Sequence, residues 1–280
     1  MVIKADCTEC QEENEPHDNN ANQSATEDLR FRPDYTFDSF VIGESNRLAF
    51  SAALSVATNP SGKYNPLYIY GGSGCGKTHL LHAIGRYIHY HHPEKNIIMV
   101  TAEDLVDEFI EAITKKNLNT NWMHEKYRNC DVLLIDDAEM IIGKTATTEF
   151  LLYTFNHLVT CSKQIVITAD RPAGKPDLTD RLTSRFLSGL SVEIHKPSRE
   201  LRFEILRQSV KPLEIAFDKR TLNYIARRTT PDLREMRGVV TRIAFCAELE
   251  GVTSIDVTFV RGVAEDLLTP SEGWRRRRQQ

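Results

Sequence analysis

The chain has 280 residues, of which 41% are hydrophobic and 26% charged, as in an ordinary globular protein of one or two domains. Its apolar runs are too short to cross a bilayer and its N-terminus lacks a signal-peptide core, so we expect a cytoplasmic protein without a membrane span. The net charge of −4 is uneven, because residues 1–28 are acidic and four arginines occupy 275–278. Bulk charge therefore gives no argument for nucleic-acid binding, and only the tail could contact phosphates.

We expect no disulfide framework from the six cysteines in a chain of this size and setting. Cys7 and Cys10, with His17 nearby, could form half of a zinc site, but a second pair of ligands is missing. His89, His91 and His92 close a helical pattern before a proline, and we favour a solvated helix end over a metal site there.

Taken in order, residues 1–30 are polar and acidic and predict a disordered arm. A helix is expected from about Leu48 to Asn59-Pro60. Short apolar runs then alternate with helical patterns, which predicts a three-layer α/β fold with a parallel sheet. The expected strands are 67–70, 96–100, 132–136, 164–168 and 191–195, and the expected helices between them are 78–91, 103–116, 147–159 and 178–187.

From Pro197 onward the pattern is helical only, which predicts a second, small all-α lid domain. The expected helices are 199–210, 218–228, 232–249 and 256–267. We therefore divide the chain into the arm 1–30, an α/β domain 31–196, a lid 197–268 and a basic tail 269–280.

The segment 71–78 has the pattern Gly-x-x-x-x-Gly-Lys-Thr between an expected strand and an expected helix, the setting of a phosphate-binding loop. Its residues are Gly71, Gly72, Ser73, Gly74, Cys75, Gly76, Lys77 and Thr78. Glycines let the backbone N–H groups converge on phosphate, lysine neutralises its charge, and the threonine hydroxyl can bind Mg²⁺. The sequence thus predicts a site for ATP or ADP with Mg²⁺, with Cys75 as a packing residue.

Other polar groups follow buried strands at the same predicted sheet edge. Asp136 would bind Mg²⁺ and Asp137 would polarise the attacking water, although a strand can also simply end in acidic residues. Thr168 and Asp170 could reach the γ-phosphate or could merely begin a loop.

Three arginines could complete such a site. Arg181 and Arg185 share a helix face and could supply charge to a neighbour's site, or could be only solvated. Arg234, which follows Asp232 at the start of a lid helix, could fold onto the phosphates.

These residues together resemble the AAA+ ATPase region of the DnaA family, the bacterial chromosomal replication initiators, over about residues 33–268. The resemblance is carried by Tyr35-Thr36-Phe37-Asp38-Ser39-Phe40, Gly71 to His82 with its His-Leu-Leu-His, Leu133 to Asp137, Thr168-x-Asp170-Arg171, Arg181 to Phe186 and Asp232 to Gly238. It implies a five-stranded parallel sheet followed by a helical lid.

By this resemblance Lys77 and Thr78 are Walker A residues, and Asp136 and Asp137 are Walker B residues. Asp170 corresponds to sensor 1, Arg234 to sensor 2, Arg185 to the trans-acting arginine finger and Arg181 to a second interface arginine. The implied nucleotide contacts also include His79 and an adenine pocket formed by Phe40, Val41 and Ile42.

The chain also departs from the family pattern. Ala138-Glu139-Met140 stands where the family usually has an apolar residue, Gln and an aromatic. Val106 and Lys144 match positions that contact single-stranded DNA, but Ala146 replaces an arginine, so we expect at most a weak contact. We expect no sequence-specific duplex binding by a helix-turn-helix, because the chain ends at Gln280 before such a domain.

Two functions remain open from the sequence. The first is an ATPase of DnaA type, a short paralogue that self-associates or co-assembles with full-length DnaA and acts in replication initiation or its regulation, with weak turnover until subunits assemble. The second is a nucleotide-gated adaptor or a module resembling helicase loaders, with little ATPase activity.

Overall fold

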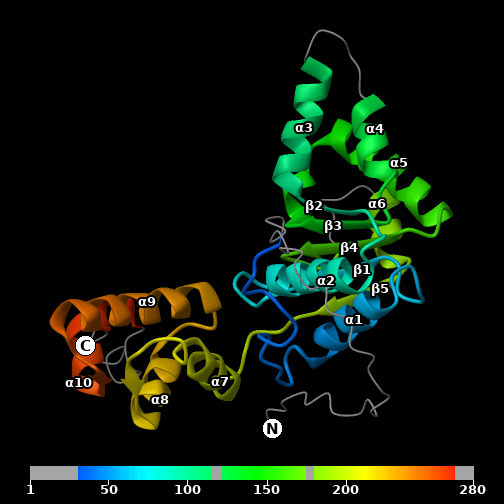
Figure 1. Cartoon of the computed structure of the whole chain (residues 1–280). Helices are drawn as coiled ribbons and strands as arrows, with labels where there is room; N and C mark the ends of the chain where they lie inside the picture. The colour runs from blue at the N-terminus through cyan, green and yellow to red at the C-terminus, as the bar shows by residue number, and fades with distance from the viewer. Residues whose placement is uncertain (1–30, 115–120, 175–179, 269–280) are drawn as a thin grey trace, which may run out of the picture.

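The computed structural model describes residues 31–114, 121–174 and 180–268 (Figure 1). The expectations for the acidic arm, for Cys7, Cys10 and His17, and for the arginines of the tail fall outside these residues. Within the described ranges, no helix is both long enough and apolar enough to cross a membrane.

A five-stranded parallel sheet forms the centre of the first domain and confirms the predicted fold class. Its strands are β1 (Leu67–Tyr70), β2 (Ile97–Thr101), β3 (Val132–Asp136), β4 (Gln164–Ala169) and β5 (Leu190–Glu193), in the order β2-β3-β4-β1-β5. Because all strands are parallel, their carboxyl ends meet at one edge of the sheet. The ends of β1, β4 and β3 therefore lie next to one another.

Helices cover both faces of this sheet (Figure 1). One face carries α1 (Arg47–Thr58) and α2 (Lys77–His91). The other carries α3 (Ala102–Thr114), α4 (Asn121–Arg128), the 3-10 turn η1 (Ala138–Ile141), α5 (Thr145–Thr160) and α6 (Asp180–Leu187). Both faces are buried, which explains why the strands read as continuous apolar runs rather than as alternating ones.

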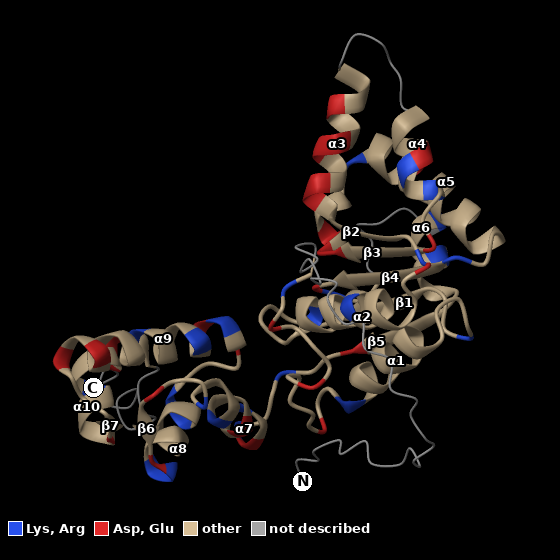
Figure 2. Ribbon diagram, viewed as in Figure 1, with Lys and Arg blue, Asp and Glu red and all other residues tan. Residues whose placement is uncertain are grey.

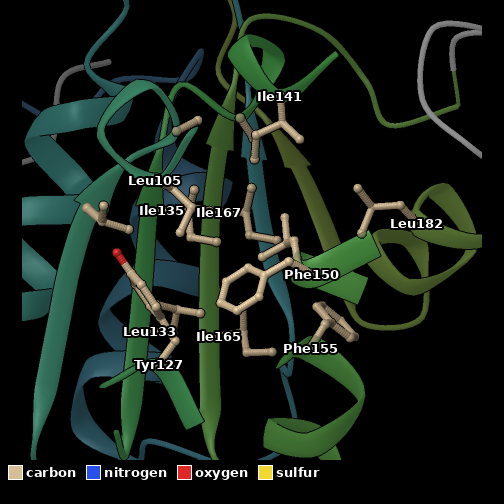
Figure 3. Packing of buried hydrophobic residues seen from close by; sticks show 14 of the residues in the cluster. Leu105, Tyr127, Leu133, Ile135, Ile141, Phe150, Phe155, Ile165, Ile167 and Leu182 are labelled. Atoms are coloured by element: carbon tan, nitrogen blue, oxygen red, sulfur yellow. The ribbon is translucent and has the colours of Figure 1, made fainter. Parts of the chain in front are cut away.

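Successive strand residues supply the two halves of the core. On β3, Leu133 and Ile135 pack with the α5 phenylalanines, as Figure 3 shows, whereas Leu134 belongs to the cluster under α1 and α2. Ile165 and Ile167 on β4 repeat the pattern. Full burial of each such side chain contributes roughly 1.5–3 kcal/mol, so the two clusters hold β3 and β4 firmly in place. The residues that follow these strands are thus presented from a rigid base.

The second domain is a bundle of short helices with its own core of residues from Leu206 to Leu268. It contains α7 (Arg199–Ser209), α8 (Lys219–Arg228), α9 (Leu233–Glu250), α10 (Val257–Ala264) and η2 (Glu265–Leu267). Each of the four α-helices begins after a residue whose side chain accepts a backbone hydrogen bond: Ser198, Asp218, Asp232 and Asp256. Such caps satisfy amide groups that a helix start leaves free.

Several elements were not predicted from the sequence. The helix α4 and the turn η1 lie where no helix was expected, and the lid contains a two-stranded parallel pair, β6 (Ala216–Phe217) with β7 (Ser254–Ile255). The strand pair spans only two residues on each side, too few for any periodic pattern. The remaining strand and helix ends differ from expectation by a few residues, apart from those that meet undescribed segments.

The strand β2 forms one edge of the sheet and borders an open groove of about 710 Å³ between α3 and α4. Acidic residues follow one another along the α3 side of this groove (Figure 2): Asp104, Asp107, Glu108 and Glu111. Their spacing places them on one face of the helix. Glu108 forms an ion pair with Lys126 on α4, with N–O distances of 2.7 and 2.8 Å.

Candidate nucleotide-binding site

The glycine-rich segment 71–78 connects β1 to α2 and places the free amide groups of a helix start at the sheet edge. Gly74 and Gly76 have φ angles of 64° and 106°, values that favour glycine. Lys77 is buried, and its Nζ donates hydrogen bonds to the carbonyl oxygens of Gly71 at 2.8 Å and Gly72 at 3.2 Å. The ammonium group thus lies over the loop that a phosphate would enter, where an anion would compete for it.

Cys75 is the loop residue that points into the protein. Its side chain is buried in the cluster under α1 and α2, and burial raises the pKa of its thiol. A buried neutral thiol is a packing residue, as the sequence analysis proposed.

A buried hydrogen-bond network joins the ends of β3 and β4. Thr168 is fully buried, and its hydroxyl donates to Asp136 Oδ1 while accepting a hydrogen bond from the backbone N–H of Asp137 at 3.1 Å. The hydroxyl therefore helps to orient the two aspartates. The structure thus shows Thr168 as a residue that links the ends of β3 and β4.

Asp137 follows β3 in a left-handed backbone conformation, with φ of 53° and ψ of 51°. Such a conformation is uncommon for a residue other than glycine and points to a constrained site. Burial and the neighbouring charge of Asp136 raise the pKa of the Asp137 carboxyl, whereas Lys77 and Arg234 lower it. A carboxylate of raised pKa is suited to accepting a proton from water.

Asp170 follows β4 at the next position along the same edge. Its carboxylate accepts a hydrogen bond from Arg171 Nε at 2.9 Å, and its backbone N–H donates to Glu139 Oε2 at 3.1 Å. The sequence marks Glu139 only as a departure from the family pattern. Its contact joins residues 31 positions apart, so sequence spacing could not reveal it.

The segment before α1 packs against the start of α2. The Phe40 ring lies beside Gly76 and makes an edge-on contact with the ring of His79 at 5.1 Å between centroids. Asn46 fixes the turn of residues 41–43, because its side chain donates to the carbonyl of Val41 and accepts from the backbone N–H of Gly43.

His79 points toward this segment rather than toward the phosphate loop. Its ring stacks on Tyr35 at 4.7 Å, and its Nε2 donates to the Thr36 carbonyl at 2.9 Å. Burial lowers the pKa of His79 to about 4, so the imidazole is neutral near pH 7. The structure therefore presents His79 as a support for the expected adenine pocket.

The lid contacts the loop through the start of α9. The backbone N–H of Leu233 donates to the Gly74 carbonyl at 3.0 Å, and Arg234 NH1 lies 3.4 Å from Ser73 Oγ. A Cβ on Gly74 would come within 1.9 Å of Asp232 Oδ1, so only glycine fits there. The sequence suggested that Arg234 could fold toward the phosphates, but it gave no signal for the contact of Asp232.

Arg181 and Arg185 both lie exposed on α6, and neither forms an ion pair with another described residue. Their exposure on α6 leaves both guanidinium groups accessible from solvent.

The residues around the loop fit Mg²⁺ in their chemistry, because the Thr78 hydroxyl and the Asp136 carboxylate are hard oxygen donors. Among the residues that the structure describes, no group of three or more His, Cys, Asp or Glu side chains could hold a metal ion by itself. A magnesium ion here would thus depend on phosphate oxygens and water for its remaining ligands.

Two residues expected near single-stranded DNA have different environments. Lys144 is exposed at the start of α5, whereas Val106 is only 6% exposed and packs in the core beneath α3. In this structure the Val106 side chain is used for packing, so of the two residues only Lys144 is exposed to solvent.

A parallel sheet of this order with a phosphate-binding loop after β1, paired acids after β3 and a helical lid defines a nucleotide-binding protein of the AAA+ class. Residues 31–193 match the bacterial DnaA ATPase domain, and the chain belongs to that family.

Relatives and solved structures agree with this assignment. The chromosomal replication initiator protein DnaA of Nautilia profundicola is 46% identical over 230 residues, which cover 82% of this chain and 52% of that protein. Domain III of the Thermotoga maritima initiator has a TM-score of 0.80 and 37% identity, covering 86% of this chain and 99% of that one. A DnaA structure bound to AMPPCP and single-stranded DNA has a TM-score of 0.70 and 32% identity, and the match covers 79% of this chain and 66% of that chain. The chain spans about half the length of the curated relatives it matches.

Proposed function

We propose that this chain binds ATP with Mg²⁺ and hydrolyses it slowly, as a DnaA-type AAA+ module in replication initiation or its regulation. One observation carries the proposal: the Lys77 loop, the Asp136–Asp137 pair and Asp170 converge at one sheet edge, against which the lid places Arg234. The AMPPCP in the related DnaA structure supports the nucleotide.

Each group then has a role in phosphoryl transfer. Lys77 would exchange its loop carbonyls for the β- and γ-phosphates, and Thr78 with Asp136 would hold the magnesium ion, which neutralises phosphate charge. Asp137 would orient the attacking water and accept its proton. Asp170 and Arg234 would contact the γ-phosphate as the two sensors, and residues 40–42 would border the adenine.

The charge that completes the site would come from another subunit. Arg185 is the proposed finger, with Arg181 beside it, because both are exposed on α6 and lack ion pairs with described residues. An arginine supplied in trans stabilises the transition state of phosphoryl transfer and raises turnover by several orders of magnitude in related systems. Turnover should therefore rise with protein concentration.

Mixing two inactive variants tests this arrangement. Arg185→Ala lacks the finger but keeps Asp137, whereas Asp137→Asn lacks the proton acceptor but keeps Arg185. We expect each alone to lose at least about tenfold in turnover and the mixture to regain activity, because one subunit's Arg185 completes the other's site. Arg207→Ala removes an exposed lid arginine and serves as the control.

Two other results are informative. Lys77→Ala should abolish ATP binding, and if it does not, the loop is not the nucleotide site. Wild-type protein that binds ATP but shows no turnover at any concentration, with or without full-length DnaA, would instead identify a nucleotide-gated adaptor.

We propose self-association or co-assembly with full-length DnaA through the α6 face. A weak contact with single-stranded DNA would rest on Lys144, since the related DnaA structure holds such DNA. Lys144→Ala should then weaken binding of an oligonucleotide, and unchanged affinity would remove this partner.

A further inference from the structure

Glu139 lies in η1, three residues beyond the Asp136 carboxylate, and is half-buried at the edge of the proposed ATP site. Its Oε2 accepts a hydrogen bond from the backbone N–H of Asp170 at 3.1 Å. The bond joins the turn after β3 to the turn after β4. It is separate from the hydrogen bonds of the buried Thr168 hydroxyl, which join the ends of the same two strands.

The contact continues into the chain beyond β4. Asp170 accepts from Arg171 Nε at 2.9 Å, and the carbonyl of Arg171 accepts a hydrogen bond from the hydroxyl of Tyr68 at 3.0 Å. Tyr68 is buried on β1, the strand that leads into the phosphate loop. The backbone of residues 170 and 171 is therefore held from both sides, by Glu139 on the β3 side and by Tyr68 on the β1 side.

We propose that Glu139 is a positioning residue for ATP hydrolysis, which fixes the backbone of Asp170 so that its carboxylate faces the γ-phosphate. The proposal rests on the function proposed above and deepens it. Asp170 begins an exposed turn, whereas the strands before it are packed in the core. Loss of the bond to Glu139 would release the turn on its β3 side, and a displacement on the order of 1 Å is enough to lower the rate of catalysis.

The surroundings of Glu139 disfavour a charged carboxylate, and the hydrogen bond from Asp170 stabilises it. Burial raises the pKa of the Glu139 carboxyl, and the charges of Asp170 and Asp137 add to this, whereas the hydrogen bond from Asp170 opposes it. What the geometry requires at this position is an acceptor oxygen. Glutamine also presents one at the same distance from the backbone, so the neutral amide should replace the carboxylate.

Steady-state ATP turnover of Glu139→Ala and Glu139→Gln tests the proposal. Loss of a hydrogen bond to a charged group costs enough for about a tenfold effect, so we expect kcat of Glu139→Ala to fall about tenfold with ATP affinity within about twofold of wild type. Glu139→Gln should stay within about threefold of the wild-type kcat. Met140→Ala, at an exposed position of the same turn, should behave as wild type. Equal losses of kcat in both Glu139 variants would overturn the positioning role.

Amide hydrogen exchange without nucleotide keeps the test independent of activity. The backbone N–H of Asp170 should exchange about tenfold faster in Glu139→Ala than in wild type and should remain slow in Glu139→Gln. Unchanged exchange in Glu139→Ala overturns the inference even if the protein is an ATPase. If wild-type protein proves inactive while the exchange result holds, the proposed function fails and the Glu139–Asp170 link stands. Thermal unfolding of each variant shows whether it remains folded.

Discussion

His79 shows how a single residue after the phosphate loop organises a second segment. Its neutral ring contacts the rings of Tyr35 and Phe40, and its Nε2–H donates a hydrogen bond to the Thr36 carbonyl. Protonation would place a charge in this half-buried position. Burial, Arg237 and His82 disfavour that charge and outweigh the hydrogen bond to Thr36 and the charge of Asp34, which favour it.

We expect the free energy of unfolding to fall as the pH is lowered from 7 to 5, in part because of His79. Its folded pKa of about 4 lies below the ordinary 6.5, so the unfolded chain binds the proton first and stability is lost below about pH 6.5. The loss due to His79 is roughly 1–2 kcal/mol at pH 5.

Chemical denaturation at pH 7 and pH 5 measures this contribution. His79→Gln should reduce the pH dependence by that amount, whereas His157→Gln, at an exposed position of α5, should keep the wild-type dependence. Identical slopes in wild type and His79→Gln would contradict the assignment.

Among single residues, those that belong to a local sequence pattern could be predicted from the sequence. Lys77 and Thr78 follow glycines in a fixed pattern, and Asp136 and Asp137 follow an apolar run, so their place at the sheet edge could be inferred. The Glu139–Asp170 and Thr168–Asp136 bonds connect residues 31 and 32 positions apart. No local pattern encodes them, since they depend on the register of β3 beside β4.

The start of α9 combines two tasks at the scale of the element. Asp232 caps the helix by accepting the backbone N–H of Arg234 at 2.8 Å, and it also packs directly against Gly74 of the phosphate loop. Asp218 caps α8 in the same way, with a hydrogen bond of 2.6 Å from the backbone N–H of Thr221, but it lies away from the loop. A comparison of Asp232 with Asp218 therefore distinguishes the effect of a lost helix cap from the effect of a lost contact with the loop.

We expect Asp232→Ala and Asp218→Ala each to lower stability by about 1 kcal/mol, the usual cost of a lost helix cap. Only Asp232→Ala should also weaken ATP binding, by about three- to tenfold. Without its cap the start of α9 is less ordered, so the lid contacts the loop in a smaller fraction of the molecules. Thermal unfolding and nucleotide titration measure the two effects. Equal ATP affinities of the two variants would show that the cap does not couple the lid to the loop.

The elements that the sequence predicted are strands marked by continuous apolar runs and helices marked by a long periodic pattern. In α4, by contrast, only Met123 and Tyr127 are buried among eight residues, so a single apolar pair marks the helix. It is held by tertiary contacts, including the ion pair of Lys126 with Glu108 on α3. The β6–β7 pair likewise depends on the lid core rather than on strand propensity.

In the whole molecule, the two domains meet at the phosphate loop. The Leu233–Gly74 bond and the guanidinium of Arg237 over the Tyr35 ring, at 5.9 Å, connect the lid to both sides of the proposed site. Figure 1 shows the N-terminal end of α9 facing the α/β domain across this junction. A nucleotide there would contact both domains at once.

ATP with Mg²⁺ should therefore protect two distant segments from amide exchange together. We expect exchange to slow by about tenfold or more in the loop 71–78 and at the start of α9, because opening either segment releases the ligand. The core strand β4 should change little and serves as the internal control. Protection confined to the α/β domain would contradict coupling through the lid.

The acidic groove beside β2 has a consequence for how copies of the molecule meet. Among the described strands, β2 pairs with β3 alone, so its outer side is an open edge onto which a strand of another molecule could add. The carboxylates of α3 border this edge, and a second copy brings the same negative charge toward it. We expect this repulsion to disfavour edge-to-edge aggregation at β2, and the assembly proposed through the exposed arginines of α6 does not use this edge.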